Sequence, residues 1–212
     1  SIFTVDTVAP SVSLNSPVNQ TNTTSASNTF NFTATDVPFS TLNCFLYING
    51  APNTTNASVS NNTATTWTLT GMANGVYSWN VSCADAASNT GGSAARTLLI
   101  DTTAPTVTLN SPANLTNTTS PTFNWTAADT LLPAGTLTCN LTIDGSPNRS
   151  SLPVTNNTAY ANTSTSAFPD GTHNWSVTCW DGLSNTGTSA TSIFTVDTVA
   201  PSVSLNSPVN QT

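Results

Sequence analysis

A repeat constrains this chain more than any other feature of its sequence. Residues 1–21 and residues 192–212 share one sequence, SIFTVDTVAPSVSLNSPVNQT, so the repeat interval is 191 residues. The run DTVAP at 6–10 also recurs near the middle of the chain, as DTTAP at 101–105. Cysteine and tryptophan recur at nearly the same spacing of 95 or 96 residues, in the pairs Cys44/Cys139, Cys83/Cys179 and Trp79/Trp175. The chain must therefore fold as successive copies of one unit of about 95 residues, a common size for a domain.

The repeat predicts four segments. Residues 6–100 and 101–196 are expected to form two domains, with residues 1–5 as the last strand of a preceding repeat and residues 197–212 as the first strand of a following one. A period this long does not fit a solenoid, whose repeats have about 20 to 50 residues. Two origins explain the identical ends: one period taken from a long tandem array, which we favour, or a subunit of a polymer with duplicated ends.

Both halves alternate apolar and polar residues with a period of two, which indicates half-buried strands. Asn49-Gly50 and Asp144-Gly145 are pairs that close hairpins, since both residue types tolerate positive φ. No stretch has a helical period, and about seven short strands in each half predict an all-β chain of two tandem immunoglobulin-like β-sandwich domains. The inward positions expected are Val12, Leu14, Phe30, Phe32, Leu42, Cys44, Leu46, Ile48, Tyr77, Trp79, Val81, Cys83, Leu98 and Ile100, then Val107, Leu109, Phe123, Trp125, Leu137, Cys139, Leu141, Ile143, Trp175, Val177, Cys179, Phe194 and Val196.

Composition excludes two kinds of partner. The chain has only two Lys and Arg against nine Asp and Glu, a net charge of −7, and 5% charged residues, where about 25% is usual. A nucleic-acid-binding surface needs Lys and Arg to neutralise phosphates, so no nucleic-acid partner is expected. The longest apolar runs have only a few residues, too few for a membrane span in this segment.

The sequence offers no catalytic set, and we expect no enzyme. A hydrolytic triad needs a base to activate its nucleophile, and the sole histidine, His173, lies at the inward position that Tyr77 occupies in the first half. This position predicts a packing or hydrogen-bonding role for the imidazole. There is no Glu, and the Asp residues recur at turns and junctions.

Three runs near the end of the second half resemble a known family. DGTHNWSV at 170–177 and DGLSNTG at 181–187 lead into FTVD at 194–197 and the Asp-Thr-x-Ala-Pro junction. These motifs resemble the tandem immunoglobulin-like repeats of prokaryotic cell-surface and filament proteins, and are especially similar to those of large archaeal surface proteins. The resemblance covers the whole chain and implies a stalk, adhesin, sheath or filament component. Its motifs are structural and identify no ligand.

The four cysteines occupy equivalent inward positions, two in each half. On an immunoglobulin-like assignment they fall on neighbouring strands of one sheet, which predicts the disulfides Cys44–Cys83 and Cys139–Cys179. Such bonds imply an oxidising, extracellular location on the cell surface. Four buried thiols are the alternative, whereas zinc is disfavoured because the chain has no Cys-x-x-Cys pair and a single His.

The sequence is rich in Asn-x-Ser/Thr acceptor sites. Those within predicted strands fall on the outward face, where a glycan would hydrate a surface that has little charge. Heavy N-glycosylation is therefore predicted, with covalent N-glycans as partners. The acceptor residues are Asn19, Asn22, Asn31, Asn53, Asn56, Asn61, Asn80, Asn114, Asn117, Asn124, Asn140, Asn148, Asn156, Asn162, Asn174 and Asn210.

The carboxylates recur at equivalent places in the repeats. One role open to them is to cap the amides of turns. The other is to hold Ca²⁺ at the domain junctions, together with Asn or backbone oxygens. No other cofactor is expected. The sets are Asp6/Asp101/Asp197, Asp36/Asp129 and Asp85/Asp181.

The junction between repeats is short and contains Pro10, Pro105 and Pro201. Proline restricts the backbone there, and stiff connections favour an extended rod. The sequence therefore predicts a structural subunit or repeat of a glycosylated extracellular fibre, stalk or sheath, whose partners are identical repeats or copies along the fibre.

The sequence leaves two alternatives open. The first is an adhesin that recognises carbohydrate or protein through loops or exposed aromatics, for which Phe45, Tyr47 and Trp180 have the outward position. The second concerns assembly: a non-covalent polymer in which the terminal strands 1–5 and 203–205 complete neighbouring sandwiches.

Overall fold

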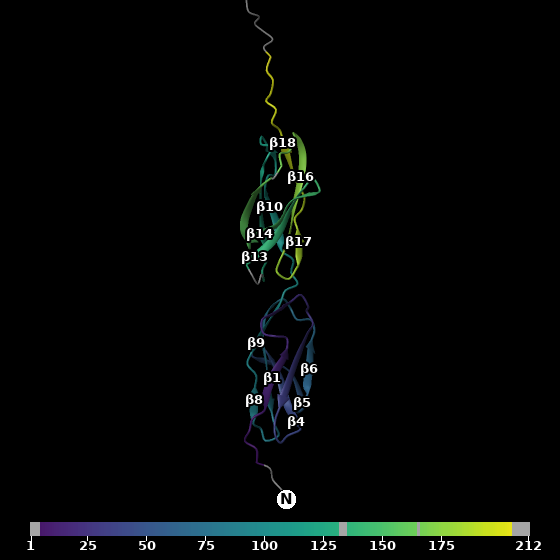
Figure 1. The fold of residues 1–212 in the computed structure, drawn as a ribbon, viewed down its shortest axis with the longest axis vertical. Coiled ribbons are helices and arrows are strands. Elements are labelled where there is room, and N and C mark those ends of the chain that lie inside the picture. Colours follow the sequence, from purple (N-terminus) through teal and green to yellow (C-terminus); the bar gives the residue numbers. More distant parts are fainter. Residues whose placement is uncertain (1–4, 132–134, 165, 205–212) are drawn as a thin grey trace, which may run out of the picture. The chain divides into compact units, whose positions relative to one another are not determined.

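The computed structural model describes residues 5–131, 135–164 and 166–204, and the chain divides into two compact units, Ser1–Thr103 and Ala104–Thr212 (Figure 1). The described residues form strands joined by turns and loops, and among them there is no helix. Accordingly, no helix that is long and apolar enough to cross a membrane occurs in this part of the chain.

The first unit is a sandwich of two sheets. One sheet has the order β1-β3-β6 and the other β2-β9-β7-β4-β5, with β8 paired to β7. β1 is antiparallel to β3, whereas β2 is parallel to β9, so the first strand of the domain is divided between the two sheets. The strands are β1 (Ser11–Ser16), β2 (Thr21–Thr23), β3 (Asn28–Thr35), β4 (Thr41–Ile48), β5 (Ala51–Ser60), β6 (Ala64–Leu69), β7 (Gly75–Ala84), β8 (Thr90–Gly92) and β9 (Arg96–Ile100).

The second unit has the same topology. Its sheets have the orders β10-β12-β15 and β11-β18-β16-β13-β14, with β17 paired to β16. The all-β prediction of two tandem immunoglobulin-like sandwiches is thus confirmed. The strands are β10 (Thr106–Ser111), β11 (Leu115–Thr116), β12 (Thr122–Ala128), β13 (Thr136–Ile143), β14 (Ser146–Thr155), β15 (Thr158–Thr163), β16 (Gly171–Trp180), β17 (Thr186–Thr188) and β18 (Ser192–Val196).

The strand count differs from the expectation of about seven in each half. The described residues contain more strands because the first strand is split in two and because β8 and β17 add a short hairpin arm to β7 and β16. The terminal segments stay predictions. Residues 1–4 and 205–212 lie outside the described residues, and residues 197–204 form no strand.

The cores lie between the sheets, on the faces that the alternation indicated. Burial alternates along β3 and β13, as expected for strands with one inward face. Trp79 packs edge-on against Phe30 at 5.0 Å between ring centroids, and Trp175 against Phe123 at the same distance. Aromatic pairs of this kind contribute about 0.5–1.5 kcal/mol beyond the area that they bury.

The hairpins also form where the sequence placed them. Asn49 and Gly50 have φ values of 52° and 78° between β4 and β5, and Asp144 and Gly145 have 48° and 73° between β13 and β14. Two consecutive positive φ values are typical of the type I′ turn, whose twist matches that of the flanking strands. These turns set the register of each hairpin.

A close backbone approach places the segment before β1 against its own domain. A Cβ atom added to Gly91 of β8 would lie 1.7 Å from the carbonyl oxygen of Pro10, and one added to Gly187 of β17 would lie 1.8 Å from that of Pro105. Only glycine leaves room for this contact. The residues that precede each domain are therefore pressed onto the hairpin arm.

Candidate functional site

The disulfides link the pairs that the sequence indicated. Cys44 on β4 lies directly opposite Cys83 on β7, and Cys139 on β13 directly opposite Cys179 on β16. Their S–S distances are 2.04 and 2.02 Å. Each closes a loop of about 40 residues, which stabilises a domain by roughly 4 kcal/mol in the loop-entropy model. Disulfide-bonded modules of this kind are typical of extracellular or surface proteins.

No sequon asparagine within the described residues is buried. Asn31, Asn80, Asn124, Asn140 and Asn174 lie within strands and alternate with buried core residues, so they face outward. Asn210 lies outside the described residues. The acceptors are therefore spread over the faces of both sheets as well as over loops.

Among the described residues, two of these asparagines donate hydrogen bonds from the side-chain nitrogen that would carry a glycan. The Asn61 Nδ2 donates to the carbonyl oxygens of Asp36 at 2.6 Å and Phe39 at 2.8 Å, and its Oδ1 accepts from the Asp36 N–H at 2.9 Å. Asn156 makes two of these three bonds with Asp129: its Nδ2 donates to the Asp129 carbonyl oxygen at 2.7 Å, and its Oδ1 accepts from the Asp129 N–H at 2.8 Å. A glycosylated amide keeps one N–H, so Asn61 could not make both of its donor bonds. Sequence reasoning missed this, because a sequon carries no sign of its tertiary partners.

The outward aromatics of the first domain lie beside a sequon. Tyr47 on β4 pairs with Asn80 on β7, and Phe45 lies two residues earlier on the same face. Phe45, Tyr47 and Trp180 are all half-buried. A surface hollow of about 490 Å³ in this domain is lined instead by residues such as Ile48, Met72 and Tyr77. Phe45 and Tyr47 therefore do not line this hollow.

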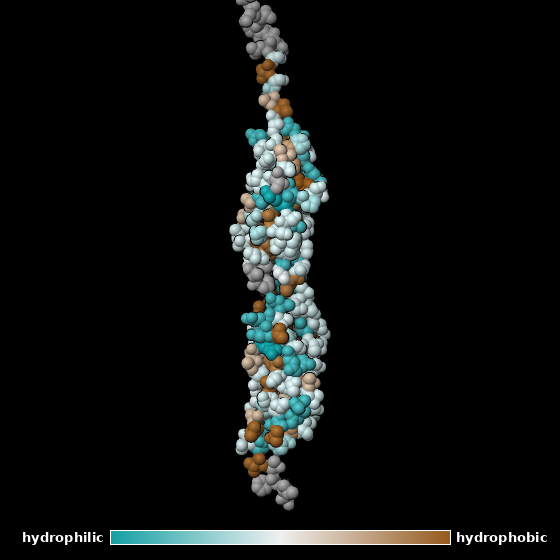
Figure 2. Space-filling view, viewed as in Figure 1, coloured by the Kyte–Doolittle hydropathy of each residue, from teal (hydrophilic) through white to brown (hydrophobic). Residues whose placement is uncertain are grey.

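The surface carries no broad apolar face in the view drawn. Figure 2 shows hydrophobic residues as small, separate spots between hydrophilic and neutral areas of each domain. The exposed large hydrophobic side chains are mostly single valines, such as Val18, Val37 and Val76. Single exposed apolar residues are ordinary on protein surfaces.

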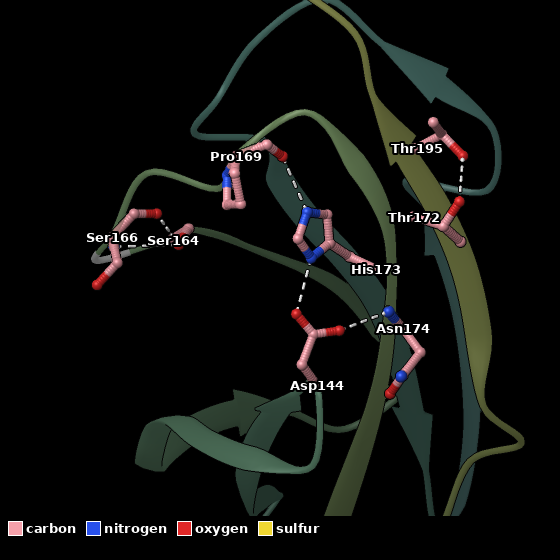
Figure 3. A network of polar contacts seen from close by, with 8 residues as sticks. All are labelled: Asp144, Ser164, Ser166, Pro169, Thr172, His173, Asn174 and Thr195. Atoms are coloured by element: carbon pink, nitrogen blue, oxygen red, sulfur yellow. Dashed lines mark hydrogen bonds and ion pairs between the residues drawn. The ribbon is translucent and has the colours of Figure 1, made fainter.

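His173 belongs to a polar network at one end of β16 (Figure 3). Its Nδ1 lies 2.7 Å from Asp144 Oδ2, and its Nε2 lies 3.0 Å from the carbonyl oxygen of Pro169. The other Asp144 oxygen accepts from the Asn174 N–H at 2.9 Å. The residue is 8% exposed, and its ring stacks on that of Phe194 with 5.3 Å between the ring centroids. This arrangement confirms the packing and hydrogen-bonding role expected of the histidine.

The network shifts both titrating groups. The hydrogen bond to Asp144, with a further one to Pro169, raises the pKa of His173 against the opposing effect of burial. Burial would raise the pKa of Asp144, but hydrogen bonds from Asn174 and His173 outweigh it and lower that pKa. Both ring nitrogens face acceptors, so the imidazolium form satisfies the site best.

Most of the repeated aspartates cap turns. Asp6 accepts from the Val8 N–H at 2.9 Å, and Asp181 accepts from the Leu183 and Asn185 N–H groups. Burial would raise the pKa of Asp85, but the side-chain and backbone N–H groups of Asn89 outweigh it and lower the pKa. Asp101, Asp129 and Asp197 each accept from the amide two residues on. All of these aspartates therefore cap the amides of turns.

Comparison with known proteins gives one family. A family model described as a bacterial Ig-like domain matches residues 3–102 and again residues 108–198. No curated protein matches the chain. The two matched segments together span most of the sequence.

Several solved structures are similar to the chain at low identity. The fibronectin(III)-like modules of Clostridium thermocellum CbhA are 19% identical, over 88% of this chain and 94% of that chain, with a TM-score of 0.39. A structure of a 1.5-MDa bacterial ice-binding adhesin is 21% identical, over 92% of this chain and 67% of that chain, with a TM-score of 0.46. Immunoglobulin domains 1–4 of Sidekick-1 are 13% identical, over 89% and 49%, with a TM-score of 0.48.

Proposed function

This chain belongs to the bacterial Ig-like domain family, whose modules are typically structural and non-catalytic, and we propose that it is a repeat of a heavily N-glycosylated extracellular fibre, stalk or sheath. The observation that supports this most is the outward placement of Asn31, Asn80, Asn124, Asn140 and Asn174 on strands of the two sandwiches. Glycans on sheet faces, rather than on loops alone, would cover the body of each domain.

The chain's charge supports the same proposal. With two cationic and nine acidic residues in 212, the surface lacks the mixed charges that usually keep a domain soluble. Glycans would supply that hydration. The stiff, proline-containing junctions at Pro10, Pro105 and Pro201 would extend a series of such domains into a rod, with identical repeats as its partners. The similarity to archaeal surface proteins remains a prediction from motifs.

The hydrogen bonds support a division of the acceptors into two groups. In the described part of the chain, no hydrogen bond from the side-chain nitrogen of Asn31 or Asn80 occupies the position of a glycan, whereas Asn61 uses both N–H groups of its amide to hold Asp36 and Phe39. We therefore propose that Asn61 stays unmodified in the folded protein. Losing this clamp would leave buried backbone groups unpaired, which costs about 1–3 kcal/mol for each group.

Mass spectrometry of native material tests both statements. Removing N-glycans should lower the intact mass, and site-by-site mapping should find glycans on Asn31 and Asn80 but none on Asn61. An unchanged mass after deglycosylation would overturn the glycosylated fibre. Full occupancy of Asn61 with normal thermal stability would overturn the proposed division of acceptors.

An adhesin remains the second candidate, because Phe45 and Tyr47 lie together on the outward face of β4. Asn80 decides between the two, since it pairs with Tyr47 across the sheet. A glycan on Asn80 would cover both rings and favour the structural role. An unmodified Asn80, with binding of a carbohydrate or protein lost in Tyr47→Ser, would favour the adhesin.

A further inference from the structure

Three carboxylates from distant parts of the first domain meet at one place. Asp6, Asp36 and Asp85 each offer one oxygen, and these three atoms lie within 4.8 Å of one another. Asp6 precedes β1, Asp36 directly follows β3, and Asp85 directly follows β7. The fold therefore gathers three negative charges at one end of the sandwich.

Asp36 is the member that turn capping does not explain. Its side chain belongs to a residue that is only 7% exposed, and among the described residues neither carboxylate oxygen has a hydrogen-bond partner. Asp6 Oδ2 is likewise buried without a partner there. Burying an unpaired carboxylate costs several kcal/mol unless a counter-charge accompanies it. One of its oxygens lies within 4.8 Å of an oxygen of each of the other two carboxylates.

No cationic side chain of the domain supplies that counter-charge. Arg96 is the only Lys or Arg within residues 6–100. Its guanidinium donates to the carbonyl oxygens of Leu14 at 2.6 Å and Pro17 at 2.8 Å, and lies over the Trp79 ring. A positive charge at the cluster must therefore come from outside the domain.

The surrounding hydrogen bonds hold the three residues while leaving ligand oxygens available. Asn61 clamps the backbone of Asp36 without touching its carboxylate. Asn89 donates to both oxygens of Asp85 and, at 3.1 Å, to the backbone carbonyl of Asp6. A site positioned in this manner binds an ion with little reorganisation.

We propose that Asp6, Asp36 and Asp85 bind a Ca²⁺ ion. All three ligands are carboxylate oxygens, which suit a hard cation. The set contains none of the nitrogen or sulfur ligands that many transition metals prefer. Three carboxylates favour Ca²⁺ over Mg²⁺, since Mg²⁺ is usually held by one or two carboxylates and keeps several waters. Extracellular modules bind Ca²⁺ with dissociation constants of about 10⁻⁴ to 10⁻³ M. The site does not depend on glycosylation.

Asp6 belongs to the DTVAP run that leads into the first domain. The ion would therefore tie that run to the sandwich.

Calorimetric titration of the full 212-residue chain with Ca²⁺, after treatment with a chelator, tests the proposal through stoichiometry. Asp36→Asn should bind one ion fewer than the wild type. Asp170→Asn is the matched control, because Asp170 is exposed and caps Thr198 outside this cluster; it should bind as many ions as the wild type. A folded wild type that binds no Ca²⁺, or an Asp36→Asn variant that binds as many ions as the wild type, would overturn the proposal.

Thermal unfolding separates ion binding from a purely structural role of Asp36. In 10 mM Ca²⁺ the wild type should melt about 5 °C or more above its midpoint in chelator, and 10 mM Mg²⁺ should give a smaller rise. In chelator, Asp36→Asn should melt at or above the wild type, since the substitution removes a buried like charge. A lower midpoint for this variant in chelator would show that the carboxylate stabilises the domain through protein contacts, which contradicts the site.

Discussion

His173 and Tyr77 occupy the same place in their domains and use the same kind of acceptor. The Tyr77 hydroxyl donates to the carbonyl oxygen of Ala73 at 2.8 Å, and the His173 Nε2 lies 3.0 Å from that of Pro169. The turn residue opposite differs as well, because Asn49 accepts from the Ser78 N–H where Asp144 accepts from that of Asn174. One domain thus has a neutral pair where the other has a pair that titrates.

This residue-scale difference predicts a pH dependence that the His173–Asp144 pair gives to the second domain. The folded state raises the pKa of His173 above 6.5, so its contribution is complete below about pH 6.5 and is lost as pH rises through the folded value. The folded state lowers the pKa of Asp144 below 3.8, so that contribution is present above about pH 3.8 and is lost as pH falls through the folded value. The pair should therefore stabilise most between these limits.

Melting curves from pH 5 to pH 9 test this, with a double variant as the control. His173→Tyr/Asp144→Asn copies the pair of the first domain and removes both titrating groups. The wild type should lose stability as pH rises above about 6.5, whereas the double variant should change much less over that range. An equal slope in both proteins would assign the pH dependence to other groups.

At the scale of elements, one residue that differs between the two domains changes which groups form hydrogen bonds near the buried tryptophan. Arg96 in β9 occupies the position of Ser192 in β18, opposite Trp79 and Trp175 respectively. In the second domain the Trp175 Nε1 donates to the Pro112 carbonyl at 3.0 Å. In the first domain Arg96 takes the equivalent carbonyl, that of Pro17, and the Trp79 Nε1 has no partner among the described residues. The Arg96 guanidinium thus donates to the proline carbonyl of the first domain, whereas the tryptophan indole donates to the equivalent carbonyl of the second.

The contact between β8 and the segment before β1 gives a second prediction at this scale. Gly91→Ala should destabilise the first domain by about 1–3 kcal/mol, because its Cβ would lie 1.7 Å from the Pro10 oxygen. It should also weaken Ca²⁺ binding, since Asp6 belongs to the displaced segment. Calorimetric titration and denaturant unfolding measure the two effects.

Gly92→Ala is the matched control for that experiment. Its Cβ would have no neighbour closer than 3.6 Å, an ordinary contact distance. This variant should keep the stability and the Ca²⁺ stoichiometry of the wild type within error. If Gly91→Ala behaved in the same way as Gly92→Ala, the segment before β1 would not be held against the hairpin arm in solution.

At the scale of the whole molecule, the identical segments 1–21 and 192–212 raise the question of how repeats are joined. We expect a covalent tandem array. Native material boiled in denaturant and reductant should then migrate as a very large species. A band near the 21.8 kDa chain mass plus glycan would instead indicate a non-covalent polymer, in which terminal strands complete neighbouring sandwiches.

Much of the molecule follows from its sequence. The period of two assigns side chains to the two faces of a strand, so the alternation in β13 and β16 was sufficient to place Leu141 and Val177 in a core and Asn140 on the surface. Asn-Gly and Asp-Gly define hairpins through the backbone freedom of those residues. Equivalent inward positions on neighbouring strands were sufficient to pair the cysteines.

Tertiary structure alone decided which polar groups meet. Asp6, Asp36 and Asp85 are far apart in the chain, and their convergence depends on where β1, β3 and β7 begin or end in the two sheets. The same packing brings Asn61 to the backbone of Asp36. It also decides that Arg96, rather than the Trp79 indole, donates to the Pro17 carbonyl. Periodicity is a local property of a strand, whereas hydrogen bonds and ion sites need groups from several strands at distances of about 3 Å, which only the folded chain can bring together.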